Sequence, residues 1–365
     1  MVELQGKVKL STAIMTHPGR IEAARTLAES VAGLSPKIVV DPAPTGRTLE
    51  NSIRSWNAVE DDSSHHLVLQ DDCYVCDDFI PTLLDAVSEM PDHALSLFTS
   101  WSSRTSNVVR LAALNGSRWA ELCDPYLPCV ALVLPARVAR SFSLSSIGGN
   151  HLHDDFALLD HIKKHDVDAY VHVPNLVQHS EIPSVAGNHI GTRLSPCFYD
   201  DAAGSGRGVA QGGTILPYFS WSKRGSSWLH RRGGNQQWVD MSDEERFLEY
   251  LGIDMDELRS RYEWVCRGRP EIDGVVDGST RHALWLSAFG LGMAAAGMGR
   301  VNLDTAAARA ALATLAPGAW RVMVEDHVLV EKELTCAIRY QRSRPGGFVY
   351  KGWQGRQFQW NVASR

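Results

Sequence analysis

The stretch HHLVLQDDCYVCDDF, residues 65–79, decides the fold class of this chain. It opens as a continuous apolar run and ends abruptly in Gln70, Asp71 and Asp72. A short continuous apolar run is typical of a strand that is buried on both faces of a sheet. The acidic end of this strand needs a partner, because neighbouring carboxylates repel each other unless a cation lies near them.

Apolar runs and helical patterns alternate along the first two hundred residues. Further strands are predicted at 8–15, 36–40, 94–98, 129–134 and 169–174. Apolar residues at spacings of three and four predict helices from residue 21, from residue 49 with Thr48 as N-cap, from residue 79, and from His153 through Ile162. This alternation predicts an α/β fold whose parallel or mixed sheet is covered by helices on both faces.

Length and composition set the broad class. The chain has 365 residues, 44% of them hydrophobic and 21% charged, which is ordinary for a soluble protein of two domains. A net charge of -6 gives no general attraction to nucleic acid, so we expect a small or neutral main partner. The longest apolar run, 283–299, is rich in Ala and Gly and predicts a buried helix rather than a membrane span. Seven cysteines and the absence of a signal-peptide pattern favour a cytoplasmic location.

The composition changes after residue 202. We expect a first domain over 1–202, a linker or loop rich in Gly, Ser and Arg over 203–240, and a mainly helical accessory domain over 241–365 that serves acceptor binding or assembly. Ser242 and Glu245 form a capping-box pattern, and helices are predicted through residue 264, over 280–299 and over 304–315. The segment from Leu334 has six Lys/Arg, no acid and interleaved aromatics, a pattern that suits nucleic acid, an anionic acceptor or packing on a neighbouring domain.

The acidic strand end predicts a ligand site. In an open α/β sheet, ligands bind outside the carboxyl ends of the strands. A hard divalent ion held there by one or two carboxylates and by substrate phosphates resolves the repulsion between Asp71 and Asp72. The alternative is a solvated acidic turn without a ligand.

Five segments in this order resemble the GT-A fold family of nucleotide-sugar glycosyltransferases. They are a first strand running into MTHPGR, then LENSIRSWNAV, LQDDC, HDDFALLDHI and VPNLVQHSE, which together span about residues 8–200. The resemblance implies a Rossmann-like mixed sheet and a DxD-like motif that holds Mn²⁺ or Mg²⁺ against the donor diphosphate. Here the motif is QDD, and because Gln70 brings no charge, the metal would rest chiefly on Asp72, with Asp71 as a second candidate.

The resemblance also implies roles for residues outside the motif. His179 matches a late histidine that serves as a further metal ligand, although a lone histidine is equally read as a hydrogen-bonded structural residue. Asp155, or in second place Asp154, matches the carboxylate that deprotonates the acceptor hydroxyl, whereas the ordinary interpretation is a pair of helix-start acids.

Other residues are predicted to contact the donor nucleotide. The turn THPGR resembles the family's nucleotide-binding loop, which selects Thr16, His17 and Arg20, although a Pro-Gly pair explains a turn without any ligand. On the following helix, Asn51 is placed to touch the nucleoside, whereas Trp56 is expected in the core. Gln70 and Asp71 complete the expected donor contacts.

The sequence therefore predicts a metal-dependent glycosyltransferase that moves a sugar from a nucleoside diphosphate, UDP being the expected one, to a hydroxyl or amine of a small molecule, glycan or peptide. One alternative is a nucleotidyltransferase, but THPGRIEAAR lacks the Gly-rich loop with a Lys that such enzymes use. Another is a catalytically inactive nucleotide-sugar-binding module, which Gln70 keeps open. The pair Cys73 and Cys76 lacks the second ligand pair that zinc requires.

Overall fold

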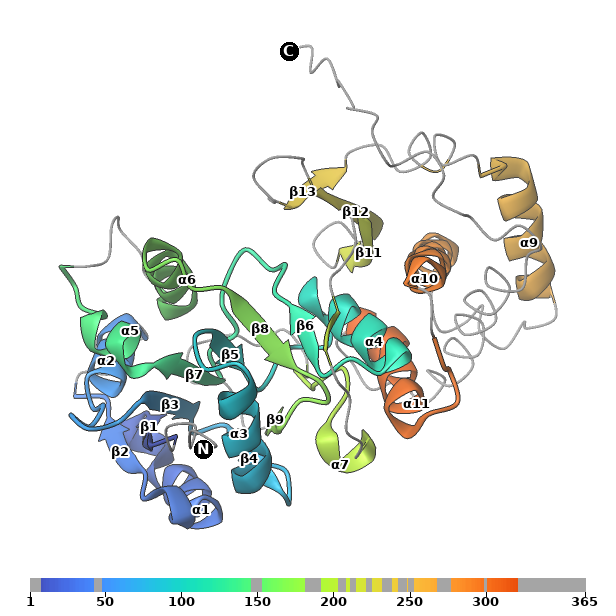
Figure 1. The fold of residues 1–365 in the computed structure, drawn as a ribbon. Coiled ribbons are helices and arrows are strands. Elements are labelled where there is room, and N and C mark those ends of the chain that lie inside the picture. Colours follow the sequence, from blue (N-terminus) through green and yellow to red (C-terminus); the bar gives the residue numbers. More distant parts are fainter. Residues whose placement is uncertain are drawn as a thin grey trace, which may run out of the picture. The chain divides into compact units, whose positions relative to one another are not determined.

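The chain forms two compact units in a computed structural model: Met1–Gln211 with Asn302–His327, and Gly212–Val301 with Val328–Arg365 (Figure 1). The structure describes residues 8–42, 48–145, 153–180, 192–202, 208–210, 215–220, 225–231, 238–241, 248, 253–267, 277–298 and 301–320. None of the helices in these ranges combines the length and apolar character that a membrane crossing needs.

The first unit contains an eight-stranded mixed sheet with the strand order β10-β6-β8-β5-β7-β3-β1-β2. Its strands are β1 (Leu10–Thr16), β2 (Lys37–Val40), β3 (His65–Gln70), β5 (Ala94–Ser96), β6 (Trp119–Glu121), β7 (Ala131–Pro135), β8 (Ala169–His172) and β10 (Val209–Ala210). Strand β1 runs parallel to β2 and β3, whereas β7 runs antiparallel to both β3 and β5. The predicted α/β fold with a mixed sheet is confirmed.

Helices cover both faces of this sheet (Figure 1). Leu67 and Leu69 of β3 share a buried cluster with α1 (Ile21–Ser30) and α3 (Phe79–Glu89). Val68 between them joins a second cluster, formed with α2 (Leu49–Trp56), α5 (Ala136–Ser141) and α6 (Asp154–Lys164). Successive side chains of a strand point to opposite faces, so an unbroken apolar run is what a sheet with two covered faces requires. Trp56 is in the core, as expected.

The order of β2, β1 and β3 creates a switch point. Helix α1 follows β1 and covers one face, whereas α2 lies between β2 and β3 in sequence and covers the other face. The chain thus passes from β1 to β2 on one side and then crosses back over β1 to form β3 on its other side. In open α/β sheets the crevice at the carboxyl ends of such strands is where ligands bind. For this protein that crevice lies beyond Thr16 and Gln70.

Two C-terminal helices belong to the first unit. Helix α11 (Ala306–Ala313) packs on α4 (Thr105–Asn115), and α12 (Leu315–Trp320) follows it. The guanidinium of Arg110 on α4 is buried and donates to the carbonyl oxygens of Ala311 and Thr314, at 3.2 and 2.9 Å. Burial lowers the pKa of Arg110 to about 9. The expected boundary at residue 241 therefore differs from the structure, because hydrogen bonds of a buried arginine join 306–314 to the first unit.

The second unit contains strands where a linker was expected. Strands β11 (Ile215–Ser220), β12 (Gly225–Arg231) and β13 (Trp238–Met241) form an antiparallel sheet, and the helices are α9 (Met255–Arg267) and α10 (Gly278–Gly297). The Gly/Ser/Arg composition of 203–240 concealed these strands, in which Leu216, Trp228 and Leu229 are buried. The capping-box pattern at Ser242 and the basic segment from Leu334 lie outside the described residues.

Candidate functional site

The site begins where β1 and β3 end side by side. Met15 is paired with Gln70, and the backbone N–H of Asp71 donates to the carbonyl of Met15 at 3.2 Å. A short 3₁₀ helix, η1 (Pro18–Arg20), follows β1 and directs the side chain of Arg20 toward the acidic motif. The loop after β1 and the end of β3 are therefore one local structure.

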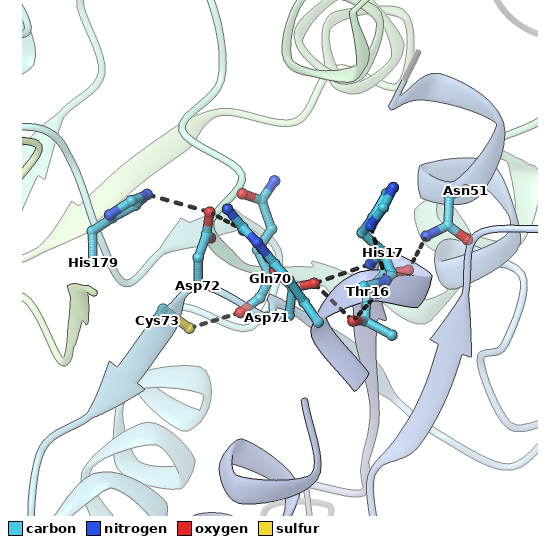
Figure 2. A network of polar contacts seen from close by, with 10 residues as sticks. Thr16, His17, Asn51, Gln70, Asp71, Asp72, Cys73 and His179 are labelled. Atoms are coloured by element: carbon cyan, nitrogen blue, oxygen red, sulfur yellow. Dashed lines mark hydrogen bonds and ion pairs between the residues drawn. The ribbon is translucent and has the colours of Figure 1, made fainter. Parts of the chain in front are cut away.

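Asp71 is the anchor of this structure (Figure 2). Its Oδ2 atom accepts hydrogen bonds from the hydroxyl of Thr16 at 2.7 Å and from the backbone N–H of His17 at 3.0 Å. Its Oδ1 atom lies 3.1 Å from Nη1 of Arg20. Both oxygens of this buried carboxylate are engaged, so Asp71 fixes the loop and is a poor candidate for direct contact with a ligand.

Asp72 and His179 meet through a small two-stranded ribbon. Strands β4 (Cys73–Val75) and β9 (Val177–His179) pair antiparallel with Cys73 opposite His179, and the N–H of Ser180 donates to the carbonyl of Asp72 at 2.8 Å. As a result, Nε2 of His179 lies 3.5 Å from Oδ2 of Asp72 (Figure 2). The two residues expected to hold a metal are therefore neighbours.

Arg20 lies against both aspartates. Its Nη1 atom is 2.9 Å from Oδ2 of Asp72 and 3.1 Å from Oδ1 of Asp71. Burial opposes the charge of Arg20, but hydrogen bonds and charges from Asp71 and Asp72 outweigh it and raise the pKa of the guanidinium. Burial likewise opposes ionisation of Asp72, yet His179 and Arg20 together lower the pKa of that carboxyl. The motif is thus anionic and already carries a counter-ion.

One carboxylate oxygen of this site is an acceptor that a cation could use. Oδ1 of Asp72 is buried and has no hydrogen-bond partner among the described residues, which is an acceptor that a cation can use. His179 approaches the same carboxylate, and imidazole suits Mn²⁺ better than Mg²⁺. Within the described ranges no group of three or more His, Cys, Asp or Glu side chains is arranged for a metal.

A second network joins the end of β3 to the start of α6. Oδ1 of Asp154 accepts a 2.7 Å hydrogen bond from the hydroxyl of Thr48, and Oδ2 accepts a 3.6 Å hydrogen bond from the thiol of Cys129. The carboxamide of Gln70 donates to the same sulfur at 3.7 Å. Thr48 is the N-cap residue of α2, as expected, but it makes no side-chain capping hydrogen bond, because its hydroxyl is directed to Asp154 instead.

Asp154 and Asp155 differ in availability. Asp154 is buried with both oxygens engaged, which suits a positioning residue. Asp155 is half-buried, and its carboxylate accepts a hydrogen bond from the N–H of Phe156 at 2.8 Å. Burial and the charge of Asp154 raise the pKa of Asp155. The geometry therefore favours Asp155 over Asp154 as a proton acceptor.

The remaining residues that were predicted to contact the donor nucleotide form hydrogen bonds with main-chain groups of the protein itself. His17 caps η1, since its Nδ1 accepts from the N–H of Gly19 at 3.0 Å. The amide of Asn51 donates to the carbonyls of Thr16 and Val39 at 3.3 and 3.4 Å, while its buried Oδ1 has no partner in the described structure. Sequence reasoning missed Cys129 and the role of Thr48, since no spacing relates them to Asp154.

The paired cysteines lie in surroundings that disfavour the thiolate form. Cys73 and Cys76 are free and buried, and burial raises the pKa of both thiols, that of Cys76 to about 12. A thiol that stays protonated is a weak nucleophile and a weak metal ligand.

Comparisons with known proteins add no family to this picture. A scan against protein-family models finds no match for the chain, and a search of curated proteins finds none either.

Proposed function

We propose that this chain is a metal-dependent glycosyltransferase of the GT-A type, which moves a sugar from a nucleoside diphosphate, UDP being the expected one, to an acceptor hydroxyl or amine. One observation carries the proposal. The acidic motif, the loop after β1 and His179 converge at the carboxyl ends of β1 and β3, beside the switch point of the sheet. This is the place where open α/β sheets bind nucleotides.

The donor side of the site supports this chemistry. Asp72 and His179 would hold Mn²⁺ or Mg²⁺, which when bound offsets the negative charge of the departing diphosphate. Arg20 places a permanent positive charge beside the same position. Oδ1 of Asn51, which has no hydrogen-bond partner within the described ranges, offers a buried acceptor for an N–H of the nucleobase.

The acceptor side would be formed at the start of α6. A carboxylate whose pKa is raised removes a proton more effectively, which suits Asp155 as general base. Phe156 beside it is 42% exposed, and its ring centroid lies 6.3 Å from that of Tyr126. The N–H of Leu127 donates to the carbonyl of Asp155 and holds the two aromatic segments together. These rings suit the apolar face of an acceptor ring.

Release of UDP tests the proposal. The protein is incubated with a panel of UDP-sugars and Mn²⁺, with and without EDTA, and free UDP is measured. We expect EDTA-sensitive release by the wild type and none by Asp72→Asn, while Asp61→Asn, an exposed control, stays at the wild-type rate. Release that is insensitive to EDTA and equal in all three proteins would refute the metal assignment.

A binding module without turnover is the second candidate, and one observation favours it. Asp71 is fully engaged and Gln70 brings no charge, so a single carboxylate remains for a metal. Such a module would gain thermal stability from UDP and Mn²⁺ without releasing UDP from any donor. Thermal shifts measured in the same samples separate the two functions.

A further inference from the structure

We infer that Arg20 is a resident counter-cation of the acidic motif and competes with a divalent ion for Asp72. The inference deepens the proposed function and rests on it only for the role of the ion. In the protein without nucleotide, the guanidinium would keep the motif in shape and keep divalent-ion affinity low. The ion would then bind together with the diphosphate rather than before it.

The position of Arg20 supports this inference. Its side chain is 7% exposed, and a single atom, Nη1, lies within 3.1 Å of a carboxylate oxygen of each aspartate. Two neighbouring carboxylates without a counter-ion would repel each other strongly. The guanidinium therefore supplies the positive charge that the sequence led us to expect from a metal. Arg20 also keeps its charge at every physiological pH, because a guanidinium does not lose its proton in this range.

The two aspartates share Arg20 unequally. Asp71 uses its other oxygen for Thr16 and His17. Asp72 shares Oδ2 between Arg20 and His179, and its Oδ1 has no hydrogen-bond partner among the residues that the structure describes. An ion at Asp72 would therefore bind a carboxylate that is already half neutralised and would lie close to another cation. Both effects weaken binding of a free ion, whereas the negative diphosphate relieves the repulsion.

Manganese binding tests the inference without any turnover. Binding of Mn²⁺ to the full chain is measured by electron paramagnetic resonance at pH 7.5, with and without UDP. We expect Arg20→Gln to bind Mn²⁺ roughly tenfold more tightly than the wild type when UDP is absent. Arg20→Lys keeps the charge and should remain weak, and Arg25→Gln, on the exposed face of α1, serves as the matched control. Equal or weaker binding by Arg20→Gln would overturn the inference.

Loss of Arg20 also removes a buried ion pair, so folding is followed by circular dichroism in the same samples. A variant that folds only when Mn²⁺ is added supports the inference, because the ion then replaces the guanidinium. A variant that stays unfolded with Mn²⁺ contradicts it. If the wild type releases no UDP but Arg20→Gln binds Mn²⁺ more tightly than the wild type, the proposed function alone is refuted. If the wild type releases UDP but Arg20→Gln binds Mn²⁺ no more tightly, the role of Arg20 alone is refuted.

Discussion

The hydroxyl of Thr48 donates a 2.7 Å hydrogen bond to Asp154, and this contact joins the starts of α2 and α6. It gives different roles to two adjacent aspartates, of which the sequence resemblance ranked Asp155 before Asp154. Asp154 is fixed by Thr48 and Cys129, whereas Asp155 keeps an accessible carboxylate. The start of α6 therefore combines a positioning residue with a candidate base.

Replacing these two aspartates should have different effects. Asp155→Asn removes the base, so we expect kcat to fall about 10²- to 10⁴-fold with little change in the donor KM. Asp154→Asn disturbs a buried hydrogen-bonded carboxylate and should cost about 1–3 kcal/mol of unfolding free energy with a smaller loss of kcat. Steady-state kinetics and urea unfolding measure both. Asp168→Asn, on the surface, is the control, and a larger kcat effect for Asp154→Asn would reverse the assignment.

Replacing Asp71 should mainly lower stability, whereas replacing Asp72 should mainly remove activity. Asp71→Asn weakens the contacts with Thr16, His17 and Arg20, and we expect it to lower the free energy of unfolding by about 2–4 kcal/mol. Asp72→Asn should destabilise less but abolish metal-dependent release of UDP. Urea denaturation and the release assay are run on the same preparations. Equal stability of Asp71→Asn and wild type would argue against the anchoring role.

The sequence predicts the sheet but not the contacts that complete the site. The apolar run ending at Gln70 and the alternation around it were sufficient for the α/β fold, because burial on both faces leaves a direct pattern. The ribbon that pairs Cys73 with His179 is a long-range contact with no periodic signal. The same holds for the reach of Arg20 to both aspartates, since a turn sequence does not reveal where its side chain points.

Buried histidines should make the protein sensitive to acid. Burial lowers the pKa of His66 and of His172 to about 4, and His66 is held by Ser11 and Ser55 at 2.7 and 2.9 Å. Because these folded-state values lie below the ordinary 6.5, protonation favours the unfolded chain. The stabilisation is complete above pH 6.5 and is lost as the pH falls to 4, on the order of 3 kcal/mol for each residue.

Urea unfolding at a series of pH values between 7 and 4 checks this prediction. We expect His66→Gln to lose less stability over this range than the wild type, because one titrating group is gone. His153→Gln, which is exposed, should follow the wild-type curve. Parallel curves for His66→Gln and wild type would show that His66 does not contribute.

A glycine of α10 should be required for packing in the second unit. A Cβ atom at Gly290 would lie 2.2 Å from Cη2 of Trp228 and 2.9 Å from Cβ of Pro217, whereas one at Gly278 meets nothing within 4 Å. We expect Gly290→Ala to cost about 1–3 kcal/mol by overpacking and Gly278→Ala to cost nothing. Thermal unfolding compares the two variants. If Gly290→Ala were as stable as Gly278→Ala, the contact between α10 and β12 would not be as described.

The position of the metal and the nucleotide tests the central claim most directly. Crystals grown with UDP and Mn²⁺ are measured at the manganese absorption edge to locate the ion by anomalous scattering. We expect one ion about 2 Å from a carboxylate oxygen of Asp72, with His179 as a second ligand and the diphosphate beside the loop after β1. The account would be contradicted if the ion and the nucleotide were bound elsewhere while Arg20 still formed its ion pairs with Asp71 and Asp72.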